Sequence, residues 1–333
     1  MKPLYFFGFV IFCILLSCQG PSCDPPEWNS ISVTYDSVSG IGYEEGCTRR
    51  DPSDIIKVDD AWYVYYTKVF GKASGYWGSI WAAKSTDDGY SWSEIGEVLA
   101  LGEPGAFDSQ ATFTPNILKH KKKFYLYYTG VKPTPGRDDG VFENNSHNDY
   151  TAIGLAISGS PEGPFIRETL DPIISVSDVT EDFDSYRVDD AVLIERENKF
   201  WLYFKGRNMS HGQTGPRHTR MGVAFSENPD GPFTKYEENP ILSNSHEVLA
   251  WAQGSGVACL ASISSTIEYA QDGLDFTTDP IEIKIPNRPN APGLFRPDLS
   301  QKIKCGKLPA WGISMIHNGS ECYLVRFSFV INL

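Results

Sequence analysis

Four ionisable residues in three distant segments are the strongest candidates for chemistry. Asp51 lies in RRDPS, Asp190 lies in VDDAV, and His246 and Glu247 are neighbours in SNSHEVLAW. Cleavage of a glycosidic bond needs a group that protonates the leaving oxygen and a carboxylate that activates water or attacks the anomeric carbon; a third acid can tune their pKa values. A lone Asp is more often a turn residue. These acids, however, fall at equivalent positions of a repeat, which favours a functional role.

The repeat consists of an apolar run, a charged turn and a second run of alternating aromatic residues. It is clearest in IIKVDDAWYVYYTK (55–68), NILKHKKKFYLYYTG (116–130) and AVLIERENKFWLYFKG (191–206). Each copy is followed by a second hairpin with a glycine-containing turn, and fainter copies lie at 256–276 and 311–327. Period-two alternation between such turns is typical of β-hairpins.

The spacing of the clear copies, about 60 to 75 residues, suits one four-stranded blade and a loop. We therefore predict an all-β fold, a five-bladed β-propeller. A β-sandwich is the alternative, but it would not explain why the two-hairpin unit recurs. In a propeller the innermost strands line the axial channel, so acids from different blades would meet there. The blade aromatics are expected in the core: Tyr63, Tyr65, Tyr125, Tyr127, Trp201 and Tyr203.

Other side chains are candidates for binding the substrate. The second blade has no carboxylate at the equivalent position and offers Thr114 instead. Arg50 could bind a sugar hydroxyl or form a structural ion pair. Arg207 and His218 lie in or beside a polar stretch between hairpins, where the loops of one propeller rim would build a pocket. The alternative for His218 is a solvated loop histidine.

These segments resemble the five-bladed glycoside hydrolases of families 43 and 117. The closer resemblance is to family 117, the exo-acting α-1,3-(3,6-anhydro)-L-galactosidases, and it covers about residues 43–300. It implies that Asp51 is the general base, that Asp190 orients the substrate and modulates pKa, and that Glu247 is the fourth-blade acid. It further implies inversion of configuration and His246 as the general acid. An imidazole with an ordinary pKa near neutrality could hold that proton.

The chain also departs from the family pattern. Ala191 follows Asp190 where the family tends to have proline, and the second-blade segment FDSQATFTPNIL matches only loosely. Family 117 members often exchange an N-terminal helical arm between subunits. The short extension at 19–42 carries few helix signals, so a homodimer is left open.

Composition and the N-terminal segment indicate the cellular context. The net charge is −13 with no basic stripe, which argues against nucleic acid as a partner. Residues 1–18 have the apolar run of an export signal, and LLSC fits a bacterial lipobox with Cys18 as the lipidated residue. Ordinary cleavage and secretion is the alternative. The expected domains are thus a lipoprotein-type signal peptide at 1–18, the extension at 19–42 and one catalytic propeller at 43–333.

No motif demands a metal or a cofactor. No C-x-x-C sequence is present, and no ligand spacing predicts a metal site, although the axial channel leaves room for a divalent ion. Of the cysteines after the leader, Cys305 and Cys322 form the most local potential disulfide, and no pairing is predicted.

The expected function is exo-acting hydrolysis of a terminal α-linked sugar from neoagaro-oligosaccharides or a related galactan, by an exported and membrane-anchored protein. Two alternatives remain open. One is a family 43-like α-L-arabinofuranosidase or β-xylosidase, in which Glu247 rather than His246 would be the acid. The other is a non-catalytic lipoprotein that binds sugar, since a fold does not determine a function.

Overall fold

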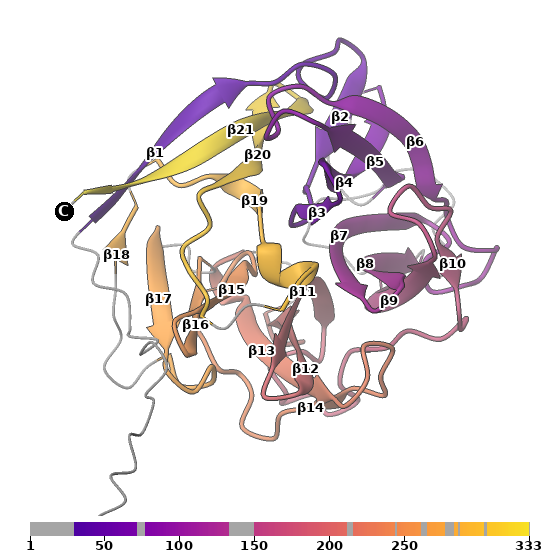
Figure 1. Cartoon of the computed structure of the whole chain (residues 1–333). Helices are drawn as coiled ribbons and strands as arrows, with labels where there is room; N and C mark the ends of the chain where they lie inside the picture. The colour runs from indigo at the N-terminus through magenta and orange to yellow at the C-terminus, as the bar shows by residue number, and fades with distance from the viewer. Residues whose placement is uncertain are drawn as a thin grey trace, which may run out of the picture.

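Five antiparallel sheets surround one central axis in the computed structural model (Figure 1). The structure describes residues 30–71, 77–132, 150–211, 216–243, 245–260, 265–276, 283–285, 287–302 and 305–332. The predicted all-β, five-bladed β-propeller is confirmed.

Each of the first three blades contains a copy of the repeat. The first consists of β2 (Cys47–Arg50), β3 (Ile56–Val58), β4 (Ala61–Phe70), β5 (Ser79–Ser85) and β6 (Ser93–Leu99). The second consists of β7 (Ala111–His120), β8 (Lys123–Lys132), β9 (Tyr150–Ser158) and β10 (Ile166–Arg167). The third consists of β11 (Arg187–Arg196), β12 (Lys199–Arg207), β13 (Arg220–Ser226) and β14 (Thr234–Lys235). The innermost strands are β2 with β3, then β7 and β11.

The two fainter copies form the last two blades. The fourth consists of β15 (Ala250–Gln253), β16 (Gly256–Cys259), β17 (Thr266–Ala270) and β18 (Ile283–Lys284). The fifth consists of β19 (Asn290–Leu294), β20 (Trp311–Asn318), β21 (Glu321–Asn332) and the N-terminal β1 (Ser30–Ser37). Among the described residues, the short 3-10 helices η2 (Pro216–His218) and η3 (Pro297–Leu299) lie outside the sheets.

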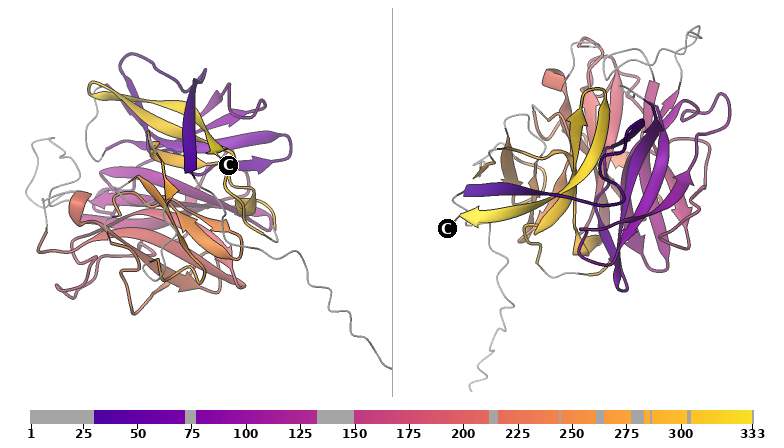
Figure 2. Two further views of the ribbon diagram at one scale, coloured as in Figure 1. Left: turned by 90° about the vertical axis from the view of Figure 1, so that its left-hand side faces the viewer. Right: turned by 90° about the horizontal axis from the view of Figure 1, so that it is seen from above.

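The N-terminal strand closes the ring. β1 pairs antiparallel with β21, from Ser30 opposite Asn332 to Ser37 opposite Val325. The two strands run side by side in Figure 2. This pairing covers the outer edge of β21, which would otherwise present unpaired backbone groups.

The hydrophobic core lies between neighbouring blades, because each sheet buries both faces against the next sheet. The six aromatic residues predicted as core are all buried. One contact recurs from blade to blade. The hydroxyl of Tyr65 donates to the carbonyl of Pro161 at 2.5 Å, that of Tyr127 to Pro229 at 2.5 Å and that of Tyr203 to Gly273 at 3.0 Å. Each tyrosine thereby ties its blade to the hairpin turn of the next blade.

Candidate active site

The innermost strands turn sharply at equivalent points near the axis. Asp51, Thr114, Asp190 and Ala291 all adopt positive φ angles, of 49°, 45°, 51° and 38°. The pairing register of β7, β11 and β19 shifts around these residues, as at a β-bulge, and the inner strand of the first blade is interrupted at Asp51. Non-glycine residues rarely adopt this conformation, and it clusters at functional sites.

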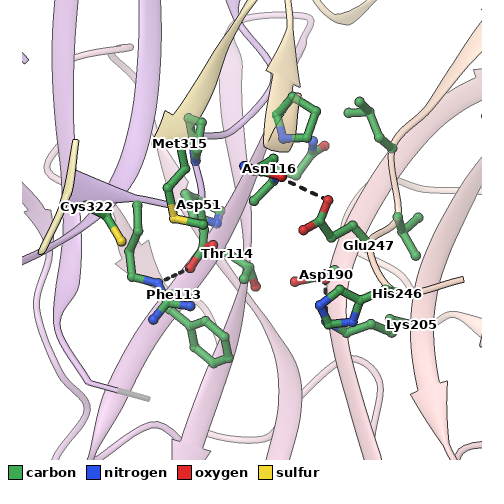
Figure 3. A pocket seen from close by; sticks show the side chains of 18 of the residues that line it. Asp51, Phe113, Thr114, Asn116, Asp190, Lys205, His246, Glu247, Met315 and Cys322 are labelled. Atoms are coloured by element: carbon green, nitrogen blue, oxygen red, sulfur yellow. Dashed lines mark hydrogen bonds and ion pairs between the residues drawn. The ribbon is translucent and has the colours of Figure 1, made fainter. Parts of the chain in front are cut away.

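One pocket of about 500 Å³ lies at this level of the axis. Its lining includes Asp51, Thr114, Asp190, His246 and Glu247 (Figure 3), and Arg50 also lines it. The structure therefore brings together six of the eight residues predicted for the site, from four blades, although their individual roles remain predictions.

A buried ion pair separates this pocket from a second one at the other ends of the same strands. Arg296 donates from Nη1 to Asp54, which lines the first pocket, and from Nη2 to Asp298, which lines the second, at 2.9 and 2.6 Å. Arg296 also donates to the carbonyls of Leu193 and Ala250. Helix η3, which directly follows Arg296, lies at the centre of the ring in Figure 1. The catalytic candidates thus face a pocket with a closed base.

Asp51 is oriented by its neighbour Arg50. Nε of Arg50 lies 2.6 Å from Oδ2 of Asp51, and Oδ1 of Asp51 has no hydrogen-bond partner within the described part of the chain. The side chain of Asp51 is only 10% exposed. A carboxylate with one oxygen held by a cation and the other turned to a pocket can accept a proton from bound water. Arg50 is therefore both an ion-pair partner and a lining residue.

Asp190 is paired with Lys205 of β12. Nζ of Lys205 lies 2.6 Å from Oδ2 of Asp190 and 3.4 Å from Oδ1 of the neighbouring Asp189. Burial raises the pKa of Asp190 to about 7; Lys205 opposes this rise and the Asp189 carboxylate adds to it. Asp190 can therefore change its protonation state near neutral pH, as expected of a group that modulates a catalytic pair.

Glu247 is held by the fifth blade. Its Oε2 accepts hydrogen bonds from Arg288 at 3.1 Å and from the backbone N–H of Ala291 at 3.0 Å. Its Oε1 has no such partner among the residues that the structure describes. Burial raises the pKa of Glu247 above its usual range, and the Arg288 cation is the largest opposing influence. A carboxyl group with a raised pKa and one oxygen available to the pocket can hold a proton and donate it.

The expectation that His246 has a near-neutral pKa is wrong. Burial lowers its pKa to about 3, and the cations Lys205, Arg288 and Arg207 lower it further. Its Nδ1 is buried without a hydrogen-bond partner in the described ranges. The imidazole is therefore neutral near pH 7, where it can hydrogen-bond to a ligand but carries no extra proton to donate.

Two predicted binding residues do not line this pocket. The buried Arg207 stacks over the ring of Tyr186, with 5.2 Å between the guanidinium carbon and the ring centre. Its positive charge contributes to lowering the pKa of His246. His218, in η2, stacks on His211 with 4.1 Å between ring centres. Neither position contradicts a role in binding a longer ligand, which stays a prediction.

Sequence reasoning missed several lining residues. Lys205 and Arg288 are the ion-pair partners of the candidate acids Asp190 and Glu247. Met315, His317 and Cys322 come from the last hairpin. Nδ1 of His317 lies 3.3 Å from Sγ of Cys322, and burial raises the pKa of that thiol to about 11. A local signal did exist for Ala291, another lining residue, because it directly precedes a proline, as Asp51 and Thr114 do. The last hairpin carried no comparable signal.

The structure also bears on the expectations about cysteine pairing, metal binding and the N-terminal segment. Cys322 is a free thiol while Cys305 is disulfide-bonded, so the most local pairing does not form. Within the described ranges, no group of three or more His, Cys, Asp or Glu side chains is placed to hold a metal ion, and the use of a metal stays untested. No described helix is long and apolar enough to cross a membrane. The signal segment, including Cys18, lies outside the described residues.

Comparisons with known proteins show which glycoside hydrolase families the chain resembles. Residues 47–210 match the profile of glycosyl hydrolases family 43. Xylosidase/arabinosidase 43A of Humicola insolens is 28% identical over 128 residues, which are 38% of this chain. The alignment spans only 31% of that relative's length.

Solved structures extend the comparison to most of the chain. Zg3597, a family 117 glycoside hydrolase produced by the marine bacterium Zobellia galactanivorans, is 25% identical, with a TM-score of 0.75 and 90% of each chain covered. The endo-arabinase of Bacteroides thetaiotaomicron VPI-5482 is 12% identical, with a TM-score of 0.55, 89% of this chain and 98% of that chain covered, and shows the fold alone. The chain is therefore similar in sequence to glycoside hydrolase family 43, and similar in sequence and fold to a solved enzyme of family 117.

Proposed function

We propose that the protein is an exo-acting glycoside hydrolase that releases a terminal α-linked sugar with inversion of configuration. The proposed substrate is a neoagaro-oligosaccharide or a related galactan fragment, and the released sugar is 3,6-anhydro-L-galactose. The observation that carries the proposal is the convergence of Asp51, Asp190 and Glu247 on one pocket, each beside its own cation. The substrate class follows from the resemblance to family 117 and from the similarity to Zg3597.

The closed base of the pocket supports exo-action. Arg296 and η3 separate the pocket from the opposite side of the propeller, so a polysaccharide cannot thread along the axis. A pocket of about 500 Å³ suits a small ligand. A chain end would enter it, with the rest of the oligosaccharide directed outward.

In the proposed mechanism, Oδ1 of Asp51 accepts a proton from a water molecule as that water forms a bond to the anomeric carbon. The bond from the anomeric carbon to the leaving oxygen breaks, and that oxygen takes a proton from Oε1 of Glu247. Asp190 accepts a hydrogen bond from a ring hydroxyl, and neutral His246 binds another polar group of the sugar. The raised pKa of Glu247 favours it over His246 as proton donor, which modifies the role that the family 117 resemblance implies.

The test is to incubate the full chain with neoagarobiose, an aryl arabinofuranoside and an aryl xyloside and to separate the products. We expect 3,6-anhydro-L-galactose from neoagarobiose. Asp51→Asn should abolish turnover and leave the circular dichroism spectrum unchanged. Turnover like that of the wild type in this variant would remove Asp51 from the mechanism, and no product from any glycan would refute the enzymatic proposal.

A second candidate is an α-L-arabinofuranosidase or β-xylosidase. The observation that favours it is the match of residues 47–210 to family 43, together with a relative named xylosidase/arabinosidase. Release of arabinose or xylose in the same assay would select it. Binding of glycans in calorimetry without any released reducing ends would instead select the non-catalytic alternative.

We also propose that residues 1–18 direct export and that Cys18 becomes lipidated, with the propeller at 43–333 as the catalytic domain. Mass spectrometry of the mature protein should find a diacylated Cys18 at its N-terminus. Cys18→Ala should release the protein from the membrane fraction, and unchanged fractionation would refute the anchor.

A further inference from the structure

The carboxyl of Glu247 belongs to the segment before β15, but the groups that hold it belong to the approach to the fifth blade. Arg288 precedes β19, and Ala291 lies within β19. The positive φ of Ala291, 38°, occurs at the register shift of β19, where the backbone N–H of Ala291 donates to Oε2 of Glu247. Both donors act on the same carboxyl oxygen, so the position of Glu247 depends on the segment at 287–291.

That segment is attached to the N-terminal strand. The hydroxyl of Tyr35 in β1 donates to the carbonyl of Asn287 at 2.7 Å, across 252 positions of sequence. Asn287 has a φ of 55° and immediately precedes Arg288. Burial raises the pKa of Tyr35 to about 12, and the positive charge of Arg288 opposes this rise, which places the cation close to the ring. The strand that closes the propeller therefore contacts the segment that holds the catalytic acid.

We infer that Arg288 is a positioning residue for Glu247 and that the N-terminal strand, through Tyr35, holds Arg288 in place. The inference rests on the proposed function, because it assigns Arg288 its role through the proton donor. Removing a positive charge next to an acid favours the protonated form. The other charged groups that act on Glu247 are Lys205 of β12 and Asp51 of the first blade, and they remain when Arg288 is replaced.

The experiment measures kcat and KM across pH 4 to 9 for the full-length wild type, Arg288→Gln and Arg288→Lys. The substrate is the one that the product assay under Proposed function identifies. If Glu247 must be protonated, the high-pH limb of kcat/KM reports its pKa. We expect Arg288→Gln to move that limb to higher pH and to lower kcat by up to about 100-fold, because the carboxyl is displaced. Arg288→Lys should return the limb toward its wild-type position, since it restores the charge, with kcat still reduced because lysine lacks the planar fork of arginine.

Tyr35→Phe tests the attachment to β1 without touching the pocket. It removes only the hydroxyl that holds Asn287. We expect the high-pH limb of kcat/KM to move to higher pH and kcat to fall, both by less than in Arg288→Gln. Tyr90→Phe is the matched control, because Tyr90 is also exposed and its ring packs against Arg326, with 4.3 Å between the guanidinium carbon and the ring centre. This control should behave as the wild type.

The outcomes distinguish a failure of the proposed function from a failure of the positioning role of Arg288. Glu247→Gln tests the proposed function alone: if it retains wild-type kcat/KM, Glu247 is not the donor. If Glu247→Gln is inactive while Arg288→Gln keeps the wild-type high-pH limb, the proposed function stands and the positioning role of Arg288 is overturned. An effect of Tyr90→Phe equal to that of Tyr35→Phe would overturn the role of Tyr35. Melting temperatures of all variants identify any loss that reflects unfolding.

Discussion

Nη1 of Arg296 lies 2.9 Å from Oδ2 of Asp54, and neither side chain is exposed. This pair joins the approach to η3 with the inner strand of the first blade, and Asn116 of β7 also donates to Asp54 at 3.1 Å. The Arg296 guanidinium further reaches carbonyls of the third and fourth blades. One ion pair thus connects most of the ring directly beneath the candidate active site.

We expect Arg296→Met to destabilise the protein by about 3–5 kcal/mol, because it leaves Asp54 buried without its cation. Urea unfolding measures the loss. Lys84→Met is the matched control: it removes an exposed ion pair with Glu162, and because water screens that pair its loss should cost far less stability than the loss of Arg296. Equal costs for the two variants would contradict a structural role of the buried pair.

The titration of Asp190 should appear in the stability of the protein. Its folded-state pKa of about 7 lies above the value in an unfolded chain, about 3.9. Between these values the folded state holds a proton that the unfolded chain has released, so this group lowers stability as pH rises from about 4 to about 7. Asparagine cannot titrate. The melting temperature of Asp190→Asn relative to the wild type should therefore increase across this window.

Differential scanning fluorimetry at pH 4.5 and 7.5 measures this difference. Asp59→Asn is the control, because Asp59 is an exposed turn residue with a similar positive φ. Comparison with this control separates the effect of the buried carboxyl from the effect of replacing any carboxylate by an amide. A difference between Asp190→Asn and the wild type that stays constant with pH would refute the raised pKa.

The identity of the proton donor can be decided with two variants on one substrate. Glu247→Gln should lower kcat/KM by about 10²–10⁴-fold, the usual contribution of a general acid. His246→Ala should lower kcat/KM less and keep the shape of the pH profile, because the pKa of His246 is lowered to about 3 by burial and nearby cations. The reverse order of losses would restore His246 as the acid, as the family 117 resemblance implies.

Closure of the ring by β1 should contribute strongly to stability. Ile31 of β1 is 1% exposed and packs into the core between the fourth and fifth blades. Ile31→Ala should destabilise the protein by about 2–5 kcal/mol in urea unfolding. Thr34→Ala, at an exposed position of the same strand, should change stability by no more than about 0.5 kcal/mol. A negligible loss for Ile31→Ala would mean that β1 is not needed for closure.

The amino-acid sequence alone determined the fold and the main acids, because the information is local and repeated. Alternating residues and glycine turns define each hairpin, and the recurrence of the two-hairpin unit defines a blade. Once blades are assumed, Asp51 and Asp190 occupy equivalent inner positions and must approach the axis. The same logic placed Thr114 in the second blade, where it indeed lines the pocket.

Only the tertiary structure decided how these acids are paired and charged. Arg288 reaches Glu247 across 41 positions and Arg296 reaches Asp54 across 242, and no local pattern marks either pair. The ordinary pKa of histidine suggested a proton donor, but burial and three cations from other segments make His246 neutral. Protonation depends on the distances to surrounding charges and on the exclusion of water, and those exist only after the blades have packed around the axis.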